Sequence, residues 1–333
     1  MKTLYGIQYL RAFAALAVVV FHAAERTGGH FRIGAAGVDV FFVISGFIMW
    51  TMSERRPVSP TRFFLDRVQR IAPSYWIVTA IMVIGALVGL FPSLKLTAGH
   101  ILGSLFFIPV RSPSNGEIWP VLVQGWTLDF EMFFYVVFAA TLFLRQNLRL
   151  WVMSAIFLCM VAAGLIFKPQ SPLLLTYTRP IILEFVAGAI LAQFWLSGKI
   201  PGAFTGLVLV IVALAGFATI EIFGLAFSEI NCGPLALALV LGVVSLEQSG
   251  SLPNIPILTY LGNSSYSIYL WHTLAVSVIA RFAVTGQMPA DVAIFISVIF
   301  GTLLGICAYE AIEKPTRNLM RAMSWQRSRP SPA

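Results

Sequence analysis

Charged residues are scarce in this 333-residue chain: only 11% of the residues are Asp, Glu, Lys or Arg, while 58% are hydrophobic. Soluble domains carry about 25% charged residues. This chain therefore has too little polar surface to cover a water-soluble protein of its size. The shortage excludes a cytosolic enzyme and an intrinsically disordered protein, and it indicates a protein whose main solvent is lipid.

Cysteine is rare as well, with Cys159, Cys232 and Cys307 far apart in the sequence. Three cysteines at such spacings form neither a disulfide framework nor a metal-binding motif. Each lies in or beside an apolar run, where cysteine acts as a small hydrophobic residue. We therefore expect no secreted disulfide scaffold, no catalytic thiol and no metal site.

Long hydrophobic runs, in contrast, are abundant. A helix that crosses a bilayer needs about 20 mostly apolar residues. The sequence predicts an all-α fold, a polytopic integral membrane protein with about ten transmembrane helices in one bundle. The segment 97–110 is too short to cross and is expected to be interfacial or re-entrant. The ten predicted spans are 5–24, 36–52, 74–91, 125–144, 150–167, 180–196, 203–224, 232–246, 262–281 and 290–310.

The positions of Lys and Arg orient these spans, because cytoplasmic loops carry more of both. Ten spans with the N-terminus inside place 14 of the 22 Lys and Arg residues on the cytoplasmic side and 7 outside, with Arg11 inside the first span. We therefore predict a multi-pass protein of the bacterial inner membrane with both termini cytoplasmic. Residues 1–323 are predicted to form one transmembrane domain, and residues 324–333 a disordered cytoplasmic tail. The net charge of +8 mostly reflects the Lys and Arg residues that mark the cytoplasmic loops. It does not indicate a nucleic-acid partner.

Two ionisable residues share the first span. Such residues cost about 2.5–3.5 kcal/mol each on insertion and usually face a bundle interior or a water-filled cavity. Arg11 and His22 are separated by three helical turns plus about 20°, so they point the same way and lie about 16 Å apart. Asp39, near the start of the second span, lies at a depth similar to that of His22. Two interpretations of Asp39 remain open: it orients the imidazole, or it caps its helix.

Further polar residues lie in later spans. Glu131 and Tyr135 are four residues apart on one helix face, and Trp126 marks the outer interface. His272 lies near the middle of the ninth span, where it either bonds a neighbouring helix or has a functional role.

Arg67 and Arg70 lie between the second and third spans. Residues 62–73 are predicted to form an amphipathic helix at the inner interface, with both Arg side chains on one face. The forked guanidinium group suits phosphate binding. Ordinary topology or lipid headgroups are the alternative explanation.

Six motifs in order, spread over almost the whole chain, make the sequence resemble the integral-membrane acyltransferase family 3, which O-acylates sugars and related acceptors. The motifs are Arg11-x10-His22, the run Gly-Val-Asp-Val-Phe-Phe-Val-Ile-Ser-Gly-Phe at 37–47, Phe63-x3-Arg67-x2-Arg70, Trp126-Thr127-Leu128-x2-Glu131-x2-Phe134-Tyr135, Tyr266-Ser267-Ile268-Tyr269-Leu270-Trp271-His272 and Glu313-Lys314-Pro315.

The resemblance implies ten transmembrane helices, a cytoplasmic acyl-CoA donor and a hydroxyl acceptor. It implies that Arg11 and His22 are essential for activity and that Arg67 and Arg70 are linked to the CoA side of the reaction. The sequence around Trp126 looks most like that of the exopolysaccharide (succinoglycan-type) acetyltransferase branch of the family. Acetyl-CoA is therefore the expected donor, and a sugar of a cell-surface polysaccharide or exopolysaccharide, free or lipid-linked, the expected acceptor. The oligomeric state stays open, with a homodimer among the options.

The predicted reaction is O-acyl transfer, with His22 as the general base. An acyl-enzyme on Ser45 or His22 is the alternative mechanism, and a lipid-linked oligosaccharide transporter or flippase is the alternative function. The predicted site residues are His22, Arg11, Asp39 and Glu131 for catalysis, Arg67, Arg70, Arg11 and Tyr75 for acyl-CoA, and Trp126, Tyr135 and His272 for the acceptor.

Overall fold

The computed structural model describes residues 4–327. Within this range the chain is almost entirely helical, and its one β-type contact is an isolated bridge between Arg111 and Ile118. The all-α prediction is confirmed. The α-helices are α1 (Tyr5–Thr27), α2 (Gly37–Arg55), α3 (Pro60–Leu87), α4 (Ala98–Leu105), α5 (Trp126–Thr141), α6 (Gln146–Phe167), α7 (Pro172–Tyr177), α8 (Leu183–Leu196), α9 (Ala203–Ile222), α10 (Glu229–Gln248), α11 (Pro256–Val284), α12 (Ala290–Ala308) and α13 (Lys314–Arg327).

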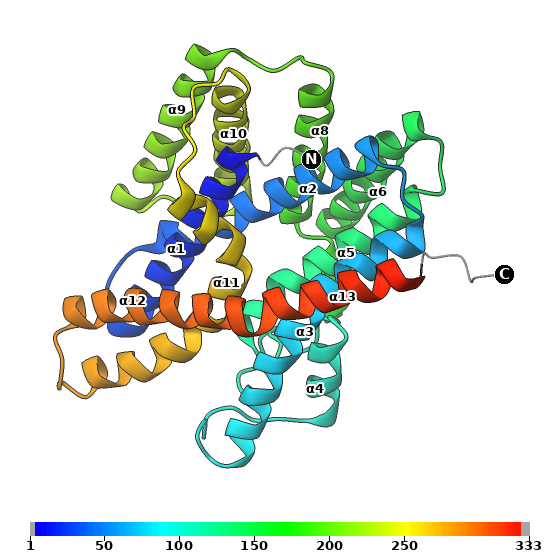
Figure 1. The fold of residues 1–333 in the computed structure, drawn as a ribbon. Coiled ribbons are helices and arrows are strands. Elements are labelled where there is room, and N and C mark those ends of the chain that lie inside the picture. The colour runs from blue at the N-terminus through cyan, green and yellow to red at the C-terminus, as the bar shows by residue number, and fades with distance from the viewer. Residues whose placement is uncertain (1–3, 328–333) are drawn as a thin grey trace.

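The long helices pack in pairs that bring the two ends of the sequence together (Figure 1). α1 packs against α11 and α12, α2 packs against α8, and α9 packs against α10. The π-helix η4 (Tyr309–Glu313) joins α12 to α13, so that these elements form one long rod, orange to red in Figure 1, which contacts α3. Side chains from the first and last parts of the chain therefore meet in the interior.

Eight helices of the described range are long and apolar enough to cross a membrane. Two predicted spans correspond to shorter helices, namely α5 with 16 residues and the segment Pro180–Leu196. The exact number of ten spans therefore stays a prediction. α4 has eight residues and a length of about 12 Å, which is too short to cross a bilayer core of about 30 Å. α13 reaches Arg327, so residues 324–327 of the predicted tail are helical, and residues 328–333 lie outside the described range.

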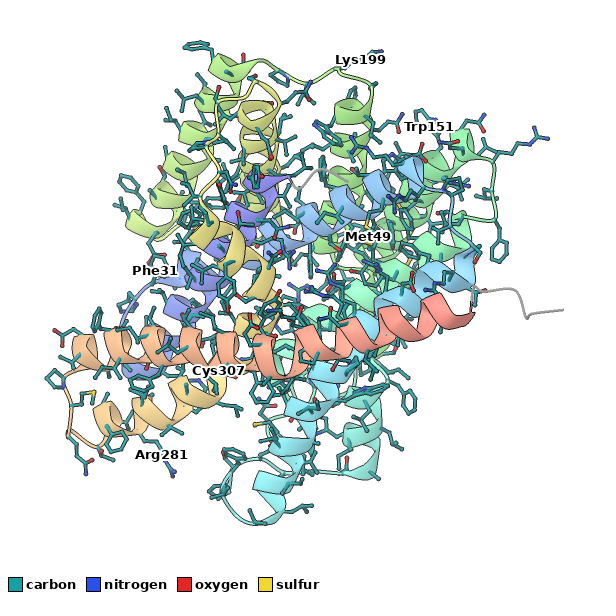
Figure 2. The ribbon with its side chains drawn as sticks, in the orientation of Figure 1. Phe31, Met49, Trp151, Lys199, Arg281 and Cys307 are labelled. Atoms are coloured by element: carbon teal, nitrogen blue, oxygen red, sulfur yellow. The ribbon has the colours of Figure 1, made fainter. Side chains whose placement is uncertain are left out.

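The outer surface is apolar, as a lipid-facing surface must be. α6 and α9 have few buried residues, and their large side chains point outward (Figure 2). Trp151 on α6 is 77% exposed and Phe204 on α9 is 81% exposed. A water-soluble protein rarely exposes so much contiguous apolar surface, so these helices mark the bilayer-facing side of the bundle.

α3 differs from the expectation. The sequence predicted a separate interfacial helix over 62–73 and a membrane span that begins at residue 74. The structure has one continuous helix of 28 residues, which begins after the N-cap Ser59 and passes through Pro73. The predicted amphipathic segment and the predicted span are therefore parts of one helix.

Side chains of α11 hold α3 on both sides of this proline. The hydroxyl of Tyr266 donates a hydrogen bond to the carbonyl of Ile71 (2.7 Å), and Nε1 of Trp271 donates to Oγ of Ser74 (3.4 Å). Membrane helices tolerate an internal proline where neighbouring helices provide polar partners for the local backbone. The α11 contacts hold α3 on both sides of Pro73.

Two glycines let α2 and α8 pack unusually closely. A Cβ atom on Gly46 would lie 1.9 Å from the carbonyl oxygen of Phe185, and a Cβ on Gly188 would lie 2.0 Å from that of Val43. Small residues at helix contacts allow backbones to approach closely in membrane proteins. This contact fixes the position of α2, which carries one wall of the site described next.

Candidate active site

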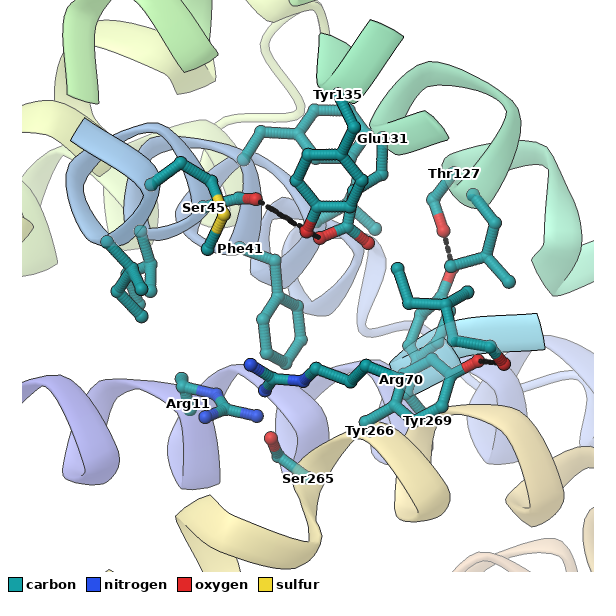
Figure 3. Close-up of a pocket in the computed structure, with 17 residues that line it drawn as sticks. Arg11, Phe41, Ser45, Arg70, Thr127, Glu131, Tyr135, Ser265, Tyr266 and Tyr269 are labelled. Carbon is teal, nitrogen blue, oxygen red and sulfur yellow. Dashed lines mark hydrogen bonds between the residues drawn. The ribbon is translucent and has the colours of Figure 1, made fainter. Parts of the chain in front are cut away.

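A cavity with an empty volume of about 750 Å³ lies among α1, α2, α3, α5 and α11. Its lining combines apolar side chains with a small set of polar ones, as Figure 3 shows. Such a mixture is typical of ligand-binding pockets. The polar lining residues are Arg11, Ser45, Arg70, Thr127, Glu131, Tyr135, Ser265, Tyr266 and Tyr269.

Glu131 accepts two hydrogen bonds at one edge of this cavity. Oγ of Ser45 donates to Glu131 Oε1 (3.1 Å), and the hydroxyl of Tyr135 donates to the same oxygen. Ser45 and Tyr135 lie 3.4 Å apart, oxygen to oxygen. The i, i+4 relation between Glu131 and Tyr135 places both side chains on one face of α5, as the sequence predicted.

A second polar group lies at the other edge. The hydroxyls of Thr127 and Tyr269 lie 3.0 Å apart, and each is within 3.1 Å of the carbonyl oxygen of Gln124. These contacts join α5 to α11 beside the cavity. They fix the ring of Tyr269, which is one of the cavity's aromatic walls.

Arg11 and Arg70 enter the same cavity from α1 and α3. Figure 3 shows their guanidinium groups pointing toward one another. Arg11 is buried, and its one hydrogen bond among the described residues is a long contact with Oε1 of Gln8 (3.4 Å). Within the described range, neither Arg forms an ion pair with a carboxylate. Two like charges that face each other with no carboxylate at ion-pair distance in the described range favour an anionic ligand between them.

Arg67 lies beside the cavity rather than in its lining. Its Nη1 contacts the sulfur of Met49 (3.8 Å), its guanidinium lies 6.0 Å from the ring centre of Phe63, and its buried Nε has no hydrogen-bond partner. Arg70 follows Arg67 by three residues on α3, so the two side chains share one helix face. The Arg67–Arg70 pair is therefore close in space, and one member reaches the cavity.

His22 lies outside the cavity lining, about 16 Å from Arg11 along α1. Its Nδ1 lies 3.3 Å from Oε2 of Glu25, one turn further on the same helix. The expected pairing of His22 with Asp39 is wrong. Equal depth does not bring two side chains together, because the lateral position of each helix also decides its neighbours.

Asp39 is buried against α8. Its side chain lies next to Glu184, and the other charges that act on it belong to Glu229 and Arg179. Arg179 forms an ion pair with Glu229 (2.6 Å). Asp39 therefore belongs to a second polar cluster, away from His22.

His272 connects the cavity wall to His22. The ring centres of His22 and His272 lie 5.3 Å apart, and those of His272 and Tyr269 lie 6.3 Å apart. Nδ1 of His272 lies 2.9 Å from the carbonyl oxygen of Ile268, which requires a proton on Nδ1. Its Nε2 is buried and has no partner in the described range.

Tyr75 and Trp126 do not reach the cavity. Tyr75 is completely buried against the ring of Phe107 (5.0 Å between centres). Because α3 continues through Pro73, Tyr75 lies about 140° around the helix from Arg70. Trp126 packs against Trp119 (6.2 Å) and lies 5.8 Å below the guanidinium of Arg179.

Several polar residues near the site were not predicted from the sequence. Glu25 follows His22 by three residues, and Tyr266 precedes Tyr269 by three, so helical spacing was a signal for both. Thr127 lies in the predicted motif at Trp126 without an assigned role, and Ser265 gave no signal, because the proximity of the two depends on how α5 and α11 pack. No group of three metal-ligating side chains gathers anywhere in the described range.

The fold and this cavity define the class of protein to which the chain belongs. It is a polytopic all-α membrane protein with a charged pocket among its helices. The chain belongs to the acyltransferase family whose model, described as an acyltransferase domain, matches residues 4–311. It is 55% identical over 304 residues to the exopolysaccharide production protein ExoZ of Rhizobium meliloti, an alignment that covers 91% of this chain and 96% of that protein.

A more distant relative is the O-acetyltransferase OatA of Staphylococcus aureus. It is 25% identical over 356 residues, which cover 95% of this chain and 57% of OatA. The chain therefore spans less than two thirds of that protein. No solved structure matches the chain.

Proposed function

We propose that this protein transfers an acetyl group from acetyl-CoA to a hydroxyl of an exopolysaccharide sugar at the bacterial inner membrane. The observation that carries the proposal is the pair Arg11 and Arg70, which face each other in the cavity without a carboxylate partner. CoA brings phosphates and a thioester whose carbonyl oxygen becomes an anion during transfer. Membership of the acyltransferase family and the name of the ExoZ relative support the choice of reaction and acceptor.

Arg67 and Arg70 bind the anionic part of the donor in this proposal, and Arg11 lies deeper along its path. Arg groups bind phosphate oxygens through two parallel N–H bonds. The pantetheine arm then runs along α1, past Tyr269 and toward His22.

His22 acts as the general base in the proposed reaction. It takes the proton of the acceptor hydroxyl while the oxygen forms a bond to the thioester carbonyl carbon. The carbon–sulfur bond breaks, and CoA leaves as the thiol after it takes up a proton. Glu25 orients the imidazole through Nδ1, which leaves Nε2 for the acceptor.

The acceptor binds on the outer side of the donor in this scheme. Trp126 offers an aromatic ring near the charged pair Arg179 and Glu229, and sugars bind to aromatic faces with polar groups beside them. Tyr135 and His272 remain proposed acceptor-side residues.

The test uses the full chain, purified in detergent, with acetyl-CoA and glycan from a strain that lacks the gene. Release of free CoA thiol and gain of acetyl groups on the glycan, in equal amounts, are expected. A flippase would move the glycan without acetyl-CoA and release no thiol. Either result decides between acyl transfer and transport.

One observation favours a second chemical route within the same function. Ser45 and Glu131 are within hydrogen-bond distance at the edge of the cavity, as a nucleophile and its base must be. Ser45 would then carry the acetyl group between donor and acceptor. Mass spectrometry of protein incubated with labelled acetyl-CoA alone would detect an acetylated Ser45, whereas direct transfer leaves the protein unlabelled.

A further inference from the structure

A second, smaller pocket lies where α13 meets α3. Its polar lining residues are Gln69, Arg70, Ser74, Glu313, Thr316 and Arg317. Arg70 also lines the main cavity. One guanidinium group therefore forms part of both walls, and a ligand bound in one of the two lies beside the other.

Arg317 is held in place but not neutralised. Its Nη2 donates a hydrogen bond to the hydroxyl of Tyr309 (3.2 Å), and its guanidinium lies 5.7 Å from the centre of that ring. Its Nε is buried without a hydrogen-bond partner, and it forms no ion pair within the described range. An unpartnered buried donor on a charged group is costly unless a ligand satisfies it.

Glu313, the carboxylate in this lining, forms no ion pair with either arginine in the described range. Oε2 of Glu313 accepts a hydrogen bond from Oγ of Ser267 (2.6 Å), which directs it toward α11. The π-helix η4 contains both Tyr309 and Glu313. Single π-helical turns inside longer helices occur often at functional sites, and here the turn presents the ring that supports Arg317.

We propose that this second pocket binds a phosphate group of the acyl donor between Arg317 and Arg70, with Gln69 and Thr316 as neutral donors. The inference rests on the proposed function, because it assigns part of the same donor. By the predicted topology, α13 follows the last span on the cytoplasmic side, where CoA is present. The shared residue Arg70 connects this phosphate site to the main cavity, so that one extended molecule occupies both.

The test measures CoA binding to the detergent-purified full chain without added lipid, in the wild type and in Arg317→Gln. Arg62→Gln is the matched control, because Arg62 is exposed on α3 and paired with Asp66 (3.0 Å). We expect Arg317→Gln to weaken CoA binding at least tenfold, Arg317→Lys to weaken it less, and Arg62→Gln to leave it within twofold. In turnover with acetyl-CoA, KM should rise while kcat stays constant.

Acetyl-pantetheine, which has no phosphate, separates binding from structure. Turnover of this donor should be equal in the wild type and in Arg317→Gln. Equal losses with both donors would assign Arg317 a structural role and overturn the inference. Unchanged CoA binding in Arg317→Gln would also overturn it, and reduced binding of phosphatidylglycerol in that case would identify a lipid headgroup as the occupant. A wild-type protein that binds no CoA would instead overturn the proposed function.

Discussion

His22 and Glu25 are three residues apart, and their side chains therefore share one face of α1. Helical spacing alone predicts that contact, just as it predicts the common direction of Arg11 and His22. The partner of Asp39 was not predictable in this way. Residue counting gives depth along each helix, whereas the neighbours of a side chain depend on helix positions across the membrane, which the sequence pattern does not contain.

Replacement of His22 by Ala should reduce acetyl transfer by about 10²–10⁴-fold, because a general base typically contributes that much to the rate. Membrane expression and the thermal unfolding midpoint should stay unchanged, since the side chain lies near the C-terminal end of α1 and is partly exposed. The measurement is acetyl incorporation into glycan by purified protein. A variant that acetylates at the wild-type rate would contradict the assignment of His22.

Replacement of Glu25 by Gln should lower kcat by less than the loss of His22 and leave KM for acetyl-CoA unchanged. Glu25 touches the imidazole and not the donor cavity. Glu117→Gln is the control, because Glu117 is an exposed carboxylate in a loop. If kcat of Glu25→Gln equals that of the control, Glu25 does not orient the base.

At the scale of elements, the sequence predicts most helices correctly and fails where packing overrides a local signal. Residues 62–73 were predicted as an interfacial helix, and the next span was predicted to begin at residue 74, although the two form one helix that contains Pro73. The polar side chains of α11 bind α3 on either side of it, and the helix continues. These contacts join residues almost 200 positions apart, so no local pattern reveals them.

The close contact of α2 with α8 gives a prediction for Gly46. Its Cβ in Gly46→Ala would overlap the carbonyl oxygen of Phe185, and overpacking of this kind typically costs about 1–3 kcal/mol. The thermal unfolding midpoint in detergent should therefore fall. Gly99→Ala on α4 is the control, because nothing lies within 4 Å of its added Cβ. Equal midpoints for the two variants would show that the helices separate at little cost.

The arrangement of the whole molecule in the membrane is predicted from its charges. The predicted topology places the loop at 145–149 and the C-terminal end inside, and the loop at 168–179 outside. Alkaline phosphatase, which is active only outside the cytoplasm, should be active when fused after residue 170 and inactive when fused after residue 146 or at the C-terminus. Activity at the C-terminus would mean an odd number of crossings. In that case one of the shorter helices, α5 or Pro180–Leu196, does not cross.

The facing arginines of the main cavity have a consequence for the stability of the protein itself. Folding brings Arg11 and Arg70 together although their positive charges repel each other. An anion bound between them would therefore stabilise the folded state. A ligand at 100 times its Kd stabilises the folded state by about 2.7 kcal/mol. Adding CoA should therefore raise the unfolding midpoint of the wild type and not that of Arg70→Gln. If the donor binds between these arginines as proposed, extraction from the membrane should succeed best with the donor present, because the bound anion would offset their repulsion.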